Sequence, residues 1–267
     1  MSLHDEIILC DHKNMHLHFL SPNALPLRSI TTPFMPMQAA MALSGEIWVQ
    51  GERPLFVDGR RTGESGVFIL SPDGTVLKFI KRTDPNDFDG VMKIVPMQNG
   101  NVVVTNLDDH FISVFDPTGE RLWHSTGKTS EDYHVYGMDY IGSSTTATIS
   151  GQSLFISIFT SAYSGAIFKF SLEKPLATSD VEALDCPPFD CYRLCSGIRA
   201  DPEEGILILA DNRNGPFFSI VDCHTGKVLF RKKTNTLNGF GSHGDWCLTR
   251  NGIAYSMDRY SKILYIY

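Results

Sequence analysis

Two pairs of histidine and carboxylate side chains have residue types that could support catalysis. His134 lies five residues before Asp139, and His243 lies two residues before Asp245. Imidazole nitrogens and carboxylate oxygens bind divalent metals, and a bound metal can activate water. A metal-dependent enzyme is therefore one hypothesis, with His134 and His243 as candidate ligands; the alternative is that each makes a structural hydrogen bond. The nearest approach to a nucleophile motif, around Ser242, lacks the G-x-S-x-G spacing, so we assign no catalytic residue and expect no cofactor.

Basic and aromatic side chains form a second group that could recognise a ligand. Protein–protein interfaces are enriched in Arg, Tyr and Trp, so this group indicates a protein or peptide partner. The eight candidates for partner binding are Arg60, Arg61, Tyr133, Tyr192, Arg213, Trp246, Arg259 and Tyr260. The same residue types could instead grip the phosphates of RNA and stack on its bases. A net charge of −7 and acidic residues close to the candidates argue against a strong RNA binder.

A repeated unit must position these residues. Its clearest copy, residues 101–122, reads strand, corner, strand, turn and strand, with β-branched and aromatic residues in the strands. The turn Asp116-Pro117-Thr118-Gly119 has the chemistry of a type I turn. Related turns begin at Ser21, Ser71, Ser171 and Asp222, so consecutive turns are separated by 50, 45, 55 and 51 residues. This period is typical of a four-stranded propeller blade of roughly 40–50 residues.

Corners between the second and third strands of each unit carry Asp and Asn, whose side chains hydrogen-bond nearby backbone. Such corners occupy residues 11–14, 106–109, 211–214 and 258–261. The second unit departs from the pattern with a long basic corner over residues 51–66, and the fourth departs at residues 160–165. The candidate arginines and Tyr260 lie in corners, whereas Tyr133, Tyr192 and Trp246 lie in links between units. We expect a ligand on the face that corners and links form together.

The first and last units are incomplete. The first has strands near residues 6–10, 16–20 and 26–31 and lacks its first strand, and the last ends after its third strand, near residues 263–267. The sequence therefore predicts an all-β fold over residues 1–267 as a single domain. The expected architecture is a six-bladed β-propeller with four-stranded antiparallel blades, in which each end blade is one strand short. A five-bladed ring closed by one strand from each terminus is the alternative, and it would leave two strands over.

Composition suits such a domain and indicates a compartment. The chain has 267 residues, of which 42% are hydrophobic and 20% charged, as in a globular protein with a real core. The acidic start is unlike a signal peptide, no Asn-x-Ser/Thr sequon occurs, and no apolar run approaches the roughly 20 residues that span a bilayer. We expect a cytoplasmic protein without a membrane partner, in which the six cysteines are reduced.

The corner D-x-x-N, the alternating apolar residues after it and the D-P-x-G turn together resemble the NHL-repeat family of β-propellers. The most similar stretches are residues 6–27, 101–122 and 206–230. The resemblance implies a scaffold for protein or RNA recognition, often the last module of a ubiquitin ligase, so further domains could lie upstream. No RING or B-box zinc pattern occurs in these residues. Other six-bladed propellers include metal-dependent lactonases and lyases, and His134 and His243 occupy places comparable to histidines of the lyase type.

Overall fold

The computed structural model divides the chain into two compact units, Met1–Thr126 (unit 1) and Gly127–Tyr267 (unit 2), and each is described by itself. Together the two units contain six antiparallel sheets, numbered here in chain order. The described residues are 6–57, 60–81, 92–106, 111–126, 141–150, 153–160, 165–171, 181–183, 197–201, 205–211, 217–233, 245–248, 254–257 and 264–266.

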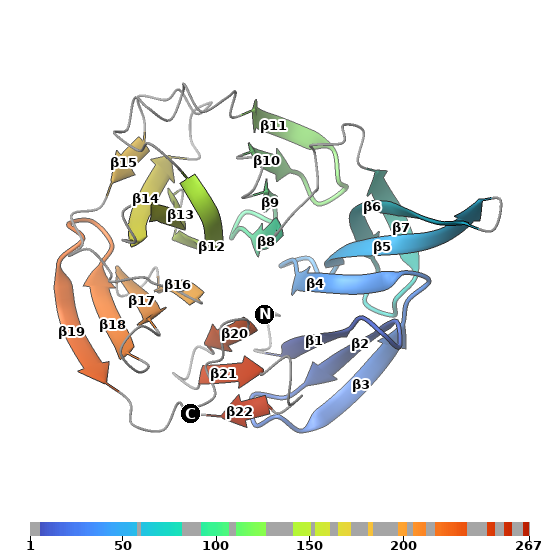
Figure 1. Cartoon of the computed structure of the whole chain (residues 1–267), viewed down its shortest axis with the longest axis horizontal. Helices are drawn as coiled ribbons and strands as arrows, with labels where there is room; N and C mark the ends of the chain where they lie inside the picture. The colour runs from blue at the N-terminus through green and yellow to red at the C-terminus, as the bar shows by residue number, and fades with distance from the viewer. Residues whose placement is uncertain are drawn as a thin grey trace. The chain divides into compact units, whose positions relative to one another are not determined.

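Unit 1 contains sheets 1 to 3, in which neighbouring strands follow one another in the chain (Figure 1). Sheet 1 consists of β1 (Ile7–Asp11), β2 (His16–Leu20) and β3 (Pro26–Thr31). Sheet 2 consists of β4 (Met35–Met41), β5 (Ile47–Val57), β6 (Arg60–Leu70) and β7 (Val76–Lys81). Sheet 3 consists of β8 (Met92–Pro96), β9 (Val102–Asn106), β10 (Phe111–Phe115) and β11 (Arg121–Thr126).

Unit 2 contains sheets 4 to 6, which have the same sequential order. Sheet 4 consists of β12 (Ile141–Ser150), β13 (Ser153–Thr160), β14 (Gly165–Ser171) and β15 (Val181–Ala183). Sheet 5 consists of β16 (Gly197–Asp201), β17 (Ile206–Asp211), β18 (Phe217–Asp222) and β19 (Val228–Lys233). Sheet 6 consists of β20 (Asp245–Leu248), β21 (Ala254–Met257) and β22 (Leu264–Ile266).

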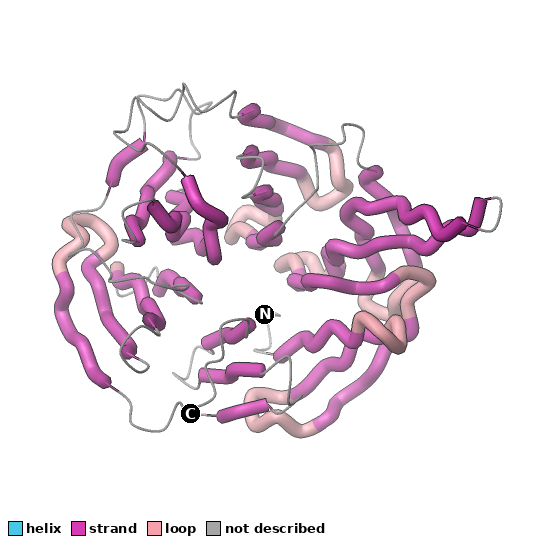
Figure 2. Tube along the Cα trace, viewed as in Figure 1, coloured by secondary structure: helices cyan, strands magenta, loops and turns pink. Residues whose placement is uncertain are grey.

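These sheets confirm the predicted all-β class and the antiparallel four-stranded unit. Strands and loops account for all the described residues (Figure 2), so no helix able to cross a membrane occurs among them. Sheets 1 and 6 each show three strands in the described part of the chain. In sheet 1, β1 and β2 are joined by a corner at residues 12–15, so β1 corresponds to the second strand of a complete sheet.

Buried side chains pack between consecutive sheets of unit 1. Along β5, Ile47 and Val49 belong to a cluster shared with sheet 1, which includes Phe19. Trp48, between them in sequence, belongs to a second cluster shared with sheet 3, which includes Val104. Because successive side chains of a strand point to opposite faces, both faces of sheet 2 are covered. This explains why its strands are apolar on both faces.

The turn at Asp116 has the hydrogen bonding that its sequence predicts. The Gly119 amide donates to the Asp116 carbonyl oxygen at 3.0 Å. The Asp116 carboxylate accepts from the Thr118 hydroxyl at 2.7 Å and from the Glu120 amide at 2.8 Å. These bonds, the one from the Thr118 hydroxyl first, lower the pKa of Asp116. Gly119 has a φ of 79°, in the left-handed region where glycine is favoured.

We predicted a long corner over residues 51–66, but residues 51–57 and 60–66 form strand, so that prediction was wrong. β5 and β6 pair along their whole length, whereas pairing with β4 reaches only Glu52 and pairing with β7 only Gly66. Beyond these points β5 and β6 form a two-stranded arm, here defined as residues 53–57 and 60–65 (Figure 1). The charged residues and glycines suggested a loop, but cross-strand pairing and the apolar residues before the tip favour a hairpin.

An exposed leucine marks a β-bulge in four of the outer strands. In β7, Lys78 pairs with Ile69 and Val76 pairs with Leu70, which leaves Leu77 without a cross-strand partner. The same offset occurs in β3, β11 and β19. Each of the four bulge leucines is more than half exposed: Leu27, Leu77, Leu122 and Leu229. A bulge twists an edge strand and interrupts its pairing, so the repeat alters its outer edge at the same point in each of these sheets.

Candidate functional site

The structure describes the backbone of three of the eight predicted partner-binding residues. Arg60 and Arg61 begin β6, where they pair with Val57 and Phe56 at the end of the arm. Trp246 lies in β20 and pairs with Ser256. The remaining candidates lie outside the described residues: Tyr133, Tyr192, Arg213, Arg259 and Tyr260, together with the alternative metal ligands His134 and His243.

Charged side chains hold the base of the arm against sheet 2. The Lys81 ammonium lies 2.5 Å from Glu64 Oε1, and this hydrogen bond lowers the pKa of Glu64. On the opposite strand, the guanidinium carbon of Arg53 lies 5.3 Å from the centre of the Phe79 ring and 5.6 Å from that of Phe68. Both distances are within the range of cation–π attraction. The arm therefore leaves the sheet in a defined direction.

Gly66 is the residue at which the arm separates from β7. A Cβ atom at this position would lie 2.3 Å from the Ile80 carbonyl oxygen and 2.6 Å from the Phe79 ring. Backbone and aromatic ring cannot both move away, so a larger residue would displace the base of the arm. The sequence places glycine where the two strands approach closely.

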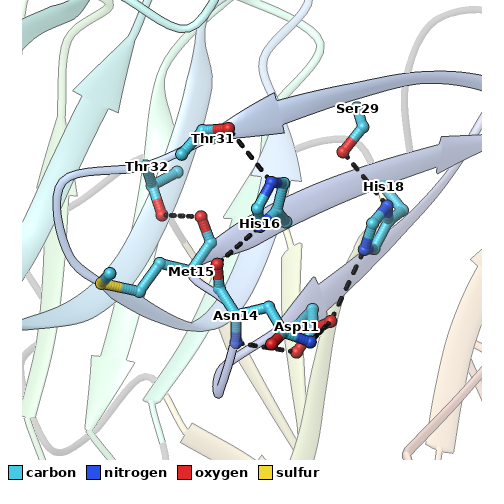
Figure 3. A network of polar contacts seen from close by, with 8 residues as sticks. All are labelled: Asp11, Asn14, Met15, His16, His18, Ser29, Thr31 and Thr32. Atoms are coloured by element: carbon cyan, nitrogen blue, oxygen red, sulfur yellow. Dashed lines mark hydrogen bonds and ion pairs between the residues drawn. The ribbon is translucent and has the colours of Figure 1, made fainter.

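The corner of sheet 1 shows how Asp and Asn shape this part of the repeat. The Asn14 backbone amide donates to Asp11 Oδ1 at 3.1 Å, and its side-chain amide donates to Asp11 Oδ2 at 2.7 Å (Figure 3). The side-chain bond from Asn14 is the main cause of the lowered pKa of Asp11. His12 and Lys13 lie between them and are exposed. The corner thus presents polar side chains to solvent while its own backbone is fixed.

A ladder of two stacked histidines, which sequence analysis missed, adjoins this corner. The rings of His16 and His18 are 5.8 Å apart and nearly parallel. His16 Nδ1 lies 2.5 Å from the Asn14 carbonyl oxygen, which can only accept, so Nδ1 carries the proton. His16 Nε2 lies 3.1 Å from the Thr31 hydroxyl. The sequence signal is the alternation of two histidines in β2 opposite two hydroxyl residues in β3.

His18 makes the corresponding contacts one step along the ladder. Its Nδ1 lies 3.2 Å from the Ser29 hydroxyl, and its Nε2 lies 3.7 Å from Asp11 Oδ2 (Figure 3). All four imidazole nitrogens therefore face oxygen atoms of the chain itself. Among the described residues, no group of three or more His, Cys, Asp or Glu side chains is close enough to hold a metal ion. The ladder is accordingly a hydrogen-bonded support for the corner.

Known structures place this fold among the β-propellers. The structure is similar to streptogramin B lyase, with a TM-score of 0.60 and 14% sequence identity over 98% of this chain and 78% of that one. It is also similar to a protein of unknown function from Bacteroides caccae, with a TM-score of 0.59 and 12% identity over 95% and 82% of the two chains. The Dos1 propeller matches with a TM-score of 0.52 and 11% identity over 90% and 55%. At these identities the likeness shows the fold alone.

No family model matches the sequence, and no curated protein does.

Proposed function

We propose that this chain is a six-bladed propeller of NHL-like type that acts as a non-catalytic recognition scaffold in the cytoplasm. It binds a protein or peptide on the face formed by the corners and the links between blades. Arg60, Arg61, Arg213, Arg259 and Tyr260 contribute from the corners. Tyr133, Tyr192 and Trp246 contribute from the links.

The observation that supports this proposal is the arm of sheet 2. Its base is held by the Lys81–Glu64 pair and by Arg53 over two aromatic rings. Its outer end carries the consecutive residues Arg60 and Arg61. Arginine is enriched at protein interfaces and recognises carboxylates with two parallel hydrogen bonds. A hairpin with two arginines at its end therefore suits an acidic segment of a partner protein.

A peptide-display selection on the purified chain tests the proposal, because it samples many peptide sequences at once. Binding of the selected peptides is then measured by fluorescence anisotropy. We expect acidic peptides whose affinity falls at least about tenfold in the variant Arg60→Glu/Arg61→Glu, because both charges at the interface are reversed. The control variant Arg121→Glu reverses an exposed charge elsewhere and should bind as the unmodified chain does. Peptides that bind both variants equally would show that the arm is not the site.

A second measurement separates this function from RNA binding. Affinity for a labelled single-stranded RNA is measured between low and moderate salt, because phosphate recognition releases counterions and falls steeply as salt rises. On our proposal RNA binds weakly at physiological salt and does not compete with the selected peptide. Tight, competing RNA binding would replace the peptide by RNA as the ligand of this face.

A further inference from the structure

The turn before the outer strand is built alike in sheets 1, 2, 3 and 5, but in sheet 1 its last residues are apolar. In each turn one backbone amide donates to the carbonyl oxygen of the residue that begins the turn, at 2.9 to 3.0 Å. The residues that donate this amide all have a positive φ, and they are Ala24, Gly74, Gly119 and Gly226. The residues that follow them are Leu25, Thr75, Glu120 and Lys227. Only sheet 1 of these four sheets has a leucine there.

The turn of sheet 1 exposes this leucine to solvent. Leu25 is 63% exposed, and Leu27, the bulge leucine of β3, is 52% exposed. Pro26 between them is exposed as well. Ala24 has a φ of 58°, in the left-handed region that disfavours an L side chain. Residues 24–27, here called the apolar turn, thus place apolar side chains together at the surface, and such groups mark interaction sites.

Equivalent turns in unit 1 dock on the outer strand of the sheet before them. Arg28 of β3 donates a hydrogen bond to the Pro72 carbonyl oxygen in the turn of sheet 2. Lys78 of β7 donates to the Gly119 carbonyl oxygen in the turn of sheet 3 at 2.9 Å, and it pairs with Glu120 at 2.8 Å. Arg28 and Lys78 each follow the bulge leucine of their strand directly. A turn of this kind therefore contacts an outer strand at the residue after the bulge leucine.

Sheet 5 presents this docking position in an apolar form. The residue after its bulge leucine, Leu229, is Phe230. Phe230 is 50% exposed and Leu229 is 53% exposed. Sheet 3 also has an aromatic residue at this position, Trp123, but that side chain is partly buried. Phenylalanine has no hydrogen-bond donor for a turn carbonyl, so Phe230 suits a turn that offers an apolar side chain.

We propose that the apolar turn of one copy of this chain docks on Leu229 and Phe230 of a second copy. Leu25 occupies the position of Glu120, and Phe230 occupies that of Lys78, so the proposed contact replaces an ion pair of unit 1 by an apolar pair. Both halves are exposed in the chain, and removal of apolar surface from water favours their association. The contact is heterologous, because each copy contributes a different surface. It goes beyond the proposed peptide binding, since neither Arg60 nor Arg61 takes part.

Sedimentation equilibrium of the full chain at increasing concentration tests the proposal. We expect the average mass to rise with concentration as copies associate head to tail. Leu25→Ser and Phe230→Ser should each weaken association at least about tenfold, because each removes one apolar half of the contact. The control variant Leu77→Ser changes a bulge leucine that is 58% exposed and lies outside the contact, so its association should stay within about twofold.

A mixture of the two variants identifies the two halves of the contact. Leu25→Ser retains the surface at Phe230, and Phe230→Ser retains the apolar turn, so the mixture should form a heterodimer that does not grow further. If the apolar turn instead paired with its own copy, Phe230→Ser would associate normally and mixing would restore nothing, which overturns the proposal.

Three other results also overturn the proposal. They are the mass of a single chain at every concentration, association that neither substitution weakens, and equal weakening by Leu77→Ser. Circular dichroism verifies that each variant retains its strands. Arg60→Glu/Arg61→Glu should associate as the unmodified chain does, so a failure of self-association is distinguishable from a failure of peptide binding.

Discussion

Replacement of Gly119 by alanine tests whether the turn of sheet 3 is packed against sheet 2 as tightly as the structure indicates. Gly119 and Gly100 lie in the same sheet and have similar φ values of 79° and 87°. Alanine at either position therefore carries a similar backbone cost of about 1–2 kcal/mol. The two sites differ in the room that is available for a Cβ atom. A Cβ atom on Gly100 would meet Pro117 at an ordinary 3.5 Å, whereas one on Gly119 would lie 2.5 Å from Ile69 Cδ1.

Ile69 cannot move aside without cost, because it is 2% exposed and belongs to the buried cluster around Trp48. Overpacking of this kind costs about 1–3 kcal/mol. We therefore expect Gly119→Ala to destabilise by about 2–5 kcal/mol when this is added to the backbone cost. Gly100→Ala should destabilise by about 1–2 kcal/mol, which is the backbone cost alone. Urea unfolding followed by tryptophan fluorescence measures both, since Trp48 is buried in unit 1.

The change Ile69→Val removes the methyl group that the new Cβ would meet. Alone it should cost about 0.5–1.5 kcal/mol. Combined with Gly119→Ala, it should cost less than the sum of the two single changes by at least about 0.5 kcal/mol, because the clash is relieved. Equal stabilities of the two alanine variants, or strictly additive effects in the cycle, would refute the packing argument.

Four further outcomes follow from described side chains. Asp73, Asp116 and Asp222 have lowered pKa values because of hydrogen bonds from Ser71, Thr118 and Thr225 respectively. The stability they contribute is complete above the unfolded-state pKa, near 4, and is lost as pH falls through the lower folded values. The variant Asp116→Asn should lose less stability than the unmodified chain as pH falls from 6 to 3. Urea unfolding at each pH measures this difference. Thr32→Val should cost about 1–2 kcal/mol in urea unfolding, since the buried Thr32 hydroxyl lies 2.6 Å from the Phe34 carbonyl oxygen and 3.0 Å from that of Met15. Burial raises the pKa of the Cys223 thiol, so iodoacetamide should label it slowly until urea unfolds the chain, as peptide mass spectrometry would show. Elemental analysis of dialysed protein should find no stoichiometric metal, and a tightly held ion would favour the enzyme hypothesis at His134 and His243.

The elements that sequence predicted well are those fixed by local chemistry. The turn at Asp116 needs an acceptor, a proline and a glycine within four residues, and all are visible in sequence. The strands of sheet 1 are recognisable because apolar residues alternate between two tight turns. Cys10 and Cys223 form no disulfide in the described part of the chain.

The elements that sequence missed depend on pairing across strands. The charges of residues 51–66 indicate a loop until Arg53 and Glu64 are seen opposite one another in a hairpin. The histidine ladder needs β2 and β3 in register, which places His16 opposite Thr31. Neither relation has a local signal, because the residues involved are separated by ten or more positions. The single-domain prediction and the number of blades likewise remain predictions.

The residue after the bulge leucine shows how a repeat can keep its fold while the side chain at one position changes. Where sheet 2 or sheet 3 supplies a turn carbonyl, the position holds Arg28 or Lys78, long cations that reach it and donate a hydrogen bond. Phe230 has no such donor and offers an apolar ring, which is satisfied by contact with an apolar side chain and gains nothing from a carbonyl. In sheet 3 the same position holds Trp123 and in sheet 5 it holds Phe230, so this position of the repeat carries either a cation or an aromatic ring. A cation gains from a turn carbonyl, whereas an aromatic ring gains from apolar neighbours, so the two kinds of residue are not interchangeable there.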